Sequence, residues 1–234
     1  MVDRTKHARH FIYKHPLFRQ RKTDGGIWYE ESVYYLWFEY LRRNEKYKAY
    51  CETKEGVNTK TVEKLYKDFG DIHSIEFKDW WRERGAELFC EQVDLQRVEE
   101  ISNVEAFRKH KSDNVLTLAI PLNKPKIWVE NQIKTKLKGK RDKLGAKSRM
   151  GVSTAKYPIH TTADRKALKR ALGVWDLYIE GNRSYVQCAN KLKIESKSDS
   201  DESRRNMAYR LNKTAKQMIE NVGKGRFPQH KVRG

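Results

Sequence analysis

The chain has 234 residues, enough for one large domain or two small ones, and its 50 Lys and Arg against 31 Asp and Glu give a net charge of +19. The mean hydropathy of −0.93 is low, but 6 Trp, 12 Tyr and 8 Phe can build a core, which argues against a disordered chain. No apolar run approaches the roughly 18 residues of a membrane span, and the N-terminus lacks a secretory signal, so we expect a soluble, cytoplasmic protein.

The first 123 residues are predicted to form a basic arm and an aromatic-rich helical domain. Residues 1–26 make the arm, which ends in the turn signal Asp24-Gly25-Gly26. Residues 27–123 make the domain, in which periodic apolar residues predict helices over 30–52, 58–70 and 74–85. The first of these carries aromatic residues around much of its circumference, so we expect it to be buried on more than one side.

Helix ends and short strands complete this domain. We expect Asn58 to cap the second helix, Gly70 to end it and Gly85 to end the third. Two apolar segments, 87–93 and 113–122, are typical of short strands. The expected fold class is therefore mainly α with a small β element, and this domain is expected to bind a protein partner or a second copy of the chain.

A basic helix and linker are predicted over residues 124–159. The helix begins near Lys126, and its cations are well placed to contact the phosphates of a nucleic acid. They include Lys134, Lys138, Lys140 and Arg141.

Residues 160–222 predict a three-helix domain, and residues 223–234 a basic tail. The first helix should face inward through Leu168, Leu172, Trp175 and Ile179, which recur at helical spacing. Ser184 is positioned to cap a short second helix.

The third helix of this domain, over 202–221, separates apolar from basic side chains. At about 100° per residue, its Met, Leu, Ile, Val and Ala side chains share one face. The opposite face lacks a carboxylate until Glu220, although a helix built only for solubility would intersperse Glu with Lys. Its polar groups suit base edges and phosphates: they are Arg205, Asn206, Tyr209, Arg210, Lys213, Lys216 and Gln217.

Three helices with a short, Ser-capped second one resemble helix-turn-helix DNA-binding domains. That resemblance implies that Arg204 to Tyr209 lie near the DNA groove and that Lys213 and Lys216 contact its backbone. The segment between the second and third helices, residues 195–201, is longer than the three- or four-residue turn of the motif.

Charge is gathered towards the C-terminus. Residues 121–234 hold 28 Lys and Arg against 10 Asp and Glu, a net charge of +18, whereas residues 27–120 are net acidic. A concentrated positive charge is typical of nucleic-acid-binding proteins. An anionic membrane is the other polyanion, but the chain has no lipid-anchor motif. We therefore expect DNA, or RNA, as partner and no membrane.

Other chemistry is weakly indicated. His7 and His10 lack further ligands at metal-binding spacing, so contacts to phosphate are favoured over metal. Asp79, Glu83 and Glu87 are spaced along one helix face and would suit Mg²⁺, but neighbouring arginines favour surface ion pairs. No nucleophile or phosphate-binding motif is found. We expect no enzyme activity, no metal and no cofactor.

Three cysteines, Cys51, Cys90 and Cys188, are widely scattered among apolar neighbours. An odd, scattered set does not suit a disulfide framework or a zinc ribbon. We interpret them as reduced thiols that are buried or half-buried.

A wider resemblance runs from Tyr34 to Pro228. The segments "YYLWFEYLRRNEKYKAYC", "FKDWWRERGAELF", "TLAIPLNKP" and "NVGKGRFP" are similar to uncharacterised bacterial proteins of prophages and other mobile elements. This similarity implies a bacterial or phage setting and work on mobile DNA. The expected location is the bacterial cytoplasm, in association with the nucleoid.

Two functions follow from these observations. The first is a prophage or mobile-element regulator of transcription that docks its last helix on duplex DNA. The alternative is a nucleic-acid-binding or adaptor subunit of a larger defence, transposition or RNA-guided nucleoprotein complex.

Overall fold

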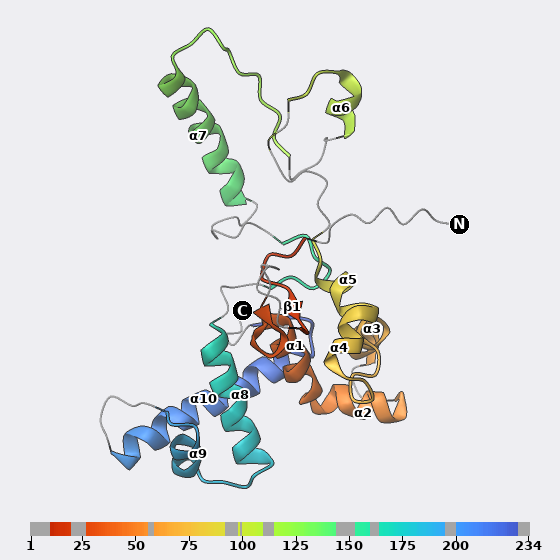
Figure 1. Ribbon diagram of the computed structural model, residues 1–234, viewed down its shortest axis with the longest axis vertical. Helices are drawn as coiled ribbons and strands as arrows, with labels where there is room; N and C mark the ends of the chain where they lie inside the picture. Colours follow the sequence, from red (N-terminus) through yellow and green to blue (C-terminus); the bar gives the residue numbers. More distant parts are fainter. Residues whose placement is uncertain are drawn as a thin grey trace. The chain divides into compact units, whose positions relative to one another are not determined.

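The computed structural model describes residues 10–19, 27–55, 59–91, 98, 100–109, 115–143, 153–159, 164–194 and 200–228. These residues form a mainly helical fold with a two-stranded parallel sheet (Figure 1), as the sequence predicted at this level. They divide into two compact units, one from Met1–Cys90 with Ala155–Gly234 and the other from Glu91–Thr154. None of the helices that the structure describes has the length and apolar composition that a bilayer crossing requires.

The core of the first unit is built around α1, Val33–Arg42, which follows the 3₁₀ turn η1, Tyr29–Glu31. Ser32 starts α1, because its hydroxyl accepts a hydrogen bond from the Tyr35 amide at 3.1 Å. Aromatic and aliphatic side chains are buried on most sides of this helix, among them Trp37, Phe38, Tyr40 and Leu41. The expectation of a helix buried on more than one side is confirmed.

The sequence predicted one helix over 30–52, but a second helix, α2, Glu45–Thr53, begins inside that range. Asn44 separates α2 from α1, because its backbone is extended, with φ −79° and ψ 108°. Its side-chain oxygen accepts from the Tyr47 amide at 3.0 Å, and its amide nitrogen donates to the Ile219 carbonyl at 2.7 Å. Asn44 is thus the N-cap of α2, and the prediction of a single helix was wrong.

The next helices end differently from one another. α3, Thr59–Phe69, ends at Gly70, whose φ of +72° suits glycine, as predicted; Asn58 lies outside the described residues. Gly85 ends no helix, because α4, Phe77–Trp80, continues through the π-helical turn η2, Trp81–Gly85, into α5, Ala86–Phe89. Gly85 instead lies against the Trp80 ring, from which an added Cβ would be 2.5 Å away. The predicted helix end at Gly85 was wrong.

The β element lies outside both predicted strands. β1, Pro16–Leu17, and β2, Ile27–Trp28, pair in parallel, with Pro16 opposite Ile27. The segment 87–93 begins inside α5, and residues 115–122, the described part of the segment 113–122, contain no strand. These two strand predictions were wrong, because a short apolar run does not by itself distinguish a strand from a buried helix or loop.

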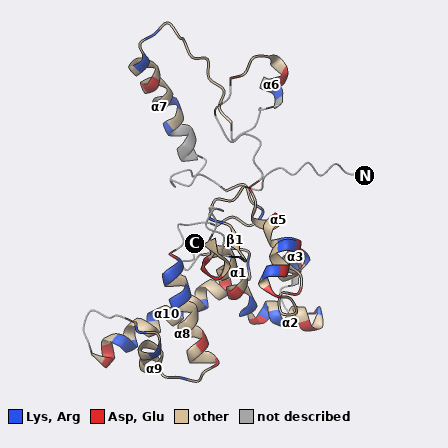
Figure 2. Ribbon diagram, in the orientation of Figure 1, with Lys and Arg blue, Asp and Glu red and all other residues tan. Residues whose placement is uncertain are grey.

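Three helices follow in the C-terminal part of the first unit: α8, Arg165–Ile179, α9, Tyr185–Lys191, and α10, Asp201–Val222. Ser184 caps α9 and forms a capping box with Gln187. A small core joins the three helices; its buried members are Val174, Cys188, Ala189, Ile194 and Ala208. Ile179, predicted to face inward, is 52% exposed. Figure 2 marks Lys and Arg on the first half of α8 and along α10.

The rest of α8 and α10 packs into the aromatic core around α1. Leu168 and Leu172 of α8 and Met218 and Val222 of α10 belong to the same buried cluster as Trp37. The structure therefore groups these residues in one unit, whereas the sequence suggested separate domains over 27–123 and 160–222.

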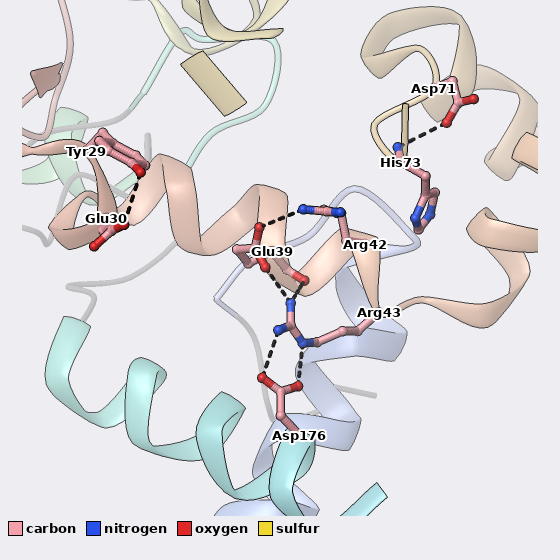
Figure 3. A network of polar contacts seen from close by, with 8 residues as sticks. All are labelled: Tyr29, Glu30, Glu39, Arg42, Arg43, Asp71, His73 and Asp176. Atoms are coloured by element: carbon pink, nitrogen blue, oxygen red, sulfur yellow. Dashed lines mark hydrogen bonds and ion pairs between the residues drawn. The ribbon is translucent and has the colours of Figure 1, made fainter. Parts of the chain in front are cut away.

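A polar contact joins α1 to α8 at the edge of this core (Figure 3). The Arg43 guanidinium donates to both oxygens of Asp176, at 2.6 and 2.7 Å, and to Glu39 at 2.7 Å. Although burial acts to lower the pKa of Arg43, hydrogen bonds to Asp176 and Glu39 outweigh it and raise that pKa. Arg43 is therefore held as a cation between two carboxylates.

The second unit contains α6, Val104–Lys109, and α7, Lys126–Lys143. Its two chain ends meet, because the Ser153 hydroxyl donates to the Glu91 carboxylate at 2.6 Å and the Thr154 hydroxyl donates at 2.9 Å. Hydrophobic side chains of this unit are widely exposed, as Leu122 (93%) and Ile127 (71%) show.

Candidate nucleic-acid interface

α10 positions the candidate interface. Ser200 starts the helix, since its hydroxyl accepts from the Ser203 amide at 3.2 Å, and Asp201 and Glu202 occupy the first turn, where carboxylates stabilise a helix N-terminus. The buried side contacts α8, α9 and the aromatic core through residues such as Ala208 and Met218. Burial of that side fixes which side chains α10 can present to a ligand.

The exposed side of α10 is cationic. Arg205, Asn206, Arg210, Lys213 and Lys216 are all exposed. No carboxylate in the part of the chain that the structure describes pairs with Arg205, Arg210, Lys213 or Lys216. From Arg205 to Lys216 the helix rises about 16 Å at 1.5 Å per residue. These cations, together with Asn206 and Tyr209, are called the α10 face below.

Arg204, predicted to bind as well, lies differently. Its side chain is 27% exposed and forms an ion pair with Asp201 at 3.4 Å. Because this contact lies within the first turn of α10, Arg204 is partly occupied by the helix itself. The structure therefore brings together Arg205, Asn206, Tyr209, Arg210, Lys213 and Lys216 on the exposed side and leaves Arg204 at its margin.

The basic residues predicted on α7 belong to the second unit. Lys134 and Lys138 are exposed, as is Lys136. The side chains of Lys140 and Arg141 lie outside the described part of the chain, although α7 runs through both positions.

Tyr209 of the α10 face belongs to a cluster of three tyrosines, and the sequence predicted only Tyr209 as a site residue. Tyr178, near the end of α8, stacks on Tyr185, at the start of α9, with ring centroids 4.4 Å apart and planes within 1°. Tyr209 of α10 meets Tyr185 edge-on, with centroids 5.7 Å apart. Tyr178 is 36% exposed and Tyr209 51%. The polar signal of α10 pointed to Tyr209, but nothing in the sequence places Tyr178 and Tyr185 against it.

Polar contacts hold the central ring of this cluster. Asn212 of α10, which is 9% exposed, donates from Nδ2 to the Tyr185 hydroxyl at 3.0 Å. Burial first, and then a hydrogen bond with Tyr178, raise the pKa of Tyr185, so its hydroxyl stays neutral. The cluster thus places aromatic rings, with the central one held by a hydrogen bond, next to a row of cations.

A groove of about 720 Å³ borders the other end of the α10 face. Trp175 and Ile179 of α8 and Ile219 of α10 give it apolar walls, and Lys46, Lys216 and Lys224 stand around it. Lys216 therefore belongs both to the α10 face and to the groove.

The other candidate sites can be followed only where the structure describes their residues. Among the described residues, no group of three or more His, Cys, Asp or Glu is placed to hold a metal ion. Asp79 lies 3.8 Å from Arg82, as the ion-pair interpretation predicted, and the π-helical turn η2 interrupts the regular spacing towards Glu83 and Glu87. His7 lies outside the described residues.

The cysteines are reduced thiols. Cys51 and Cys188 are buried and Cys90 is half-buried. Burial, followed by the charge of Asp71, raises the pKa of the Cys51 thiol to about 12, which keeps it protonated and unreactive.

The α10 face and the tyrosine cluster thus bring exposed cations and aromatic rings together on α8, α9 and α10. Comparison with family models, with curated proteins and with solved structures finds no match to this chain.

Proposed function

We propose that this protein binds DNA through the α10 face. The observation that carries the proposal is the exposed row of Arg205, Arg210, Lys213 and Lys216, for which the described part of the chain offers no carboxylate partner. Unpaired cations spaced along a helix gain free energy by replacing the counterions of a phosphate backbone. A row of cations needed only for solubility gains more from neighbouring carboxylates.

In this proposal α8, α9 and α10 act like a helix-turn-helix domain, with α10 as the helix that contacts duplex DNA. Support comes from the short, Ser184-capped α9 and from the fully buried Ala189 and Ala208, whose small side chains allow α9 and α10 to approach closely. Arg205, Asn206 and Arg210 contact base edges, and Lys213 and Lys216 contact phosphates. Lys134 and Lys138 of α7 add phosphate contacts.

The proposed biological role is regulation of a prophage or other mobile element. It depends on the resemblance of the sequence to proteins of such elements. A nucleic-acid-binding subunit of a larger complex would use the same face on RNA, so the binding experiment includes an RNA duplex of the same sequence.

The proposal is tested by measuring the affinity of the full chain for duplex DNA between 50 and 200 mM salt. The four proposed phosphate contacts, from Lys134, Lys138, Lys213 and Lys216, predict a slope of about −3.6 in a plot of log K against log salt. Affinity should therefore fall by roughly a hundredfold over this range of salt. Lys216→Ala should weaken binding to all sequences alike and make the slope shallower by about 0.9. Arg205→Ala and Arg210→Ala should also reduce discrimination between sequences.

The matched control is Lys78→Ala, which removes an exposed cation from α4 instead of α10. It should change affinity little. An affinity that does not respond to salt, or an equal loss in Lys78→Ala and Lys216→Ala, would show that the α10 face is not the binding surface. Tighter binding to the RNA duplex would favour the subunit role over the regulator.

A further inference from the structure

The cluster of Tyr178, Tyr185 and Tyr209 leaves aromatic surface exposed to solvent. Tyr185 covers one face of the Tyr178 ring at 4.4 Å, so the 36% of Tyr178 that is exposed lies on its remaining face and edges. Tyr209 contacts Tyr185 only at an angle of 84° and leaves half of its own surface in solvent. Three aromatic rings from three helices thus end in an open aromatic surface.

The position of Tyr209 places this surface under any chain that the α10 face binds. Arg205 and Lys213 lie four residues before and after Tyr209, and positions four apart share one side of a helix. The helix rises about 6 Å over four residues. A phosphate chain that contacts both cations therefore passes directly over the Tyr209 ring.

Paired and unpaired nucleotides differ in what they can offer such a ring. In a duplex, each base is stacked between its neighbours and presents only its edges to a groove. An unpaired base presents a free aromatic face, and stacking of that face on an aromatic side chain stabilises complexes with single-stranded nucleic acids whatever the base. Exposed tyrosines beside a helix that carries Arg205, Arg210 and Lys213 have the composition of such stacking sites.

We propose that Tyr209, and Tyr178 on the other side of Tyr185, stack unpaired bases of the nucleic acid that lies along α10. Tyr185, held by the hydrogen bond from Asn212, positions the two outer rings. This inference rests on the proposed function and narrows it: the ligand is nucleic acid that carries unpaired nucleotides, such as a bulge, a junction or a frayed end.

The test compares two labelled DNA probes, a fully paired duplex of about 20 base pairs and the same duplex with three unpaired adenines in one strand. The readout is the ratio of their affinities for the full chain. Wild-type protein should bind the bulged probe about tenfold more tightly, the effect of one stacked base. Tyr209→Ala and Tyr178→Ala should each lower the ratio, and Tyr209→Phe, which keeps the ring, should preserve it. Lys216→Ala should weaken both probes and leave the ratio unchanged.

A second measurement does not depend on the variants. A fluorescent adenine analogue in the bulge should lose emission when wild-type protein binds, because stacking quenches it. A wild-type ratio near one, or a preference for the bulged probe that both alanine variants retain, would overturn the stacking site. The proposed function would still stand in that case if binding to the paired duplex depended on salt. Failure to bind either probe would overturn both.

Discussion

Asp68, near the end of α3, shows how a single carboxylate joins distant segments of the chain. It accepts hydrogen bonds from the Lys156 ammonium at 2.6 Å and from the Tyr157 hydroxyl at 2.7 Å, and its side chain is 10% exposed. Burial acts to raise its pKa, but the hydrogen bonds from Lys156 and Tyr157 outweigh burial and hold the pKa below the ordinary 3.8. The folded protein therefore favours the charged carboxylate.

Because its pKa is lowered, the contribution of Asp68 to the stability of the fold depends on pH. Because the pKa of Asp68 is lower in the folded than in the unfolded chain, the carboxylate stabilises the fold above about pH 4, and this contribution disappears as the pH falls through the folded pKa. At pH 7, Asp68→Asn should lower the free energy of unfolding by about 1–2 kcal/mol. The difference from wild type, measured by urea unfolding, should shrink below about pH 4.

The control for this experiment is Asp79→Asn, whose carboxylate is 58% exposed and 3.8 Å from Arg82. This variant should change the free energy of unfolding by less than about 0.5 kcal/mol at pH 3 and at pH 7. An Asp68→Asn effect that is the same at pH 3 and pH 7 would contradict the assignment of the stabilisation to the charged carboxylate.

At the scale of elements, the break between α1 and α2 depends on Asn44. Its side chain caps α2 and also binds the Ile219 carbonyl in the last turn of α10, and it is 7% exposed. Asn44→Ala removes both hydrogen bonds and leaves a buried carbonyl without this donor. We expect a loss of about 2–3 kcal/mol in the free energy of unfolding. Asn190→Ala, an exposed position on α9, is the matched control and should stay within about 0.5 kcal/mol of wild type.

The helix ends show what the sequence could and could not predict. Apolar spacing predicted most helices, and local chemistry predicted their ends at Ser184 and Gly70, because a cap or a positive φ depends on neighbouring residues only. The break at Asn44 depends on Ile219, which is 175 residues away in the chain. The continuation through Gly85 likewise depends on space beside Trp80 that only the folded structure defines.

The candidate site divides in the same way. Helical periodicity alone predicted the exposed side of α10, since the buried face of that helix is mostly apolar. The tyrosine cluster was missed because it depends on how the turn between α8 and α9 returns Tyr185 onto Tyr178. A stacking contact between separate helices has no sequence periodicity that would reveal it.

At the scale of the whole molecule, the basic half of the sequence is not one structural unit. Residues 121–234 carry a net charge of +18, but the structure assigns α7 to the second unit and α10 to the first. The helices expected to form an independent C-terminal domain share a core with α1, as Leu172, Met218 and Val222 show. The described core of the first unit contains no residue from 91–154.

Opposite results are therefore expected from two truncations. A fragment of residues 160–228 should show no cooperative unfolding in urea, because separation from α1 exposes the faces of α8 and α10 that bury Leu168, Met218 and Val222. A chain in which a short Gly-Ser linker replaces residues 92–152 should unfold cooperatively, since Glu91 and Ser153 are already joined by a hydrogen bond of 2.6 Å. Cooperative unfolding of the 160–228 fragment by itself would instead show that the C-terminal helices form a separate domain.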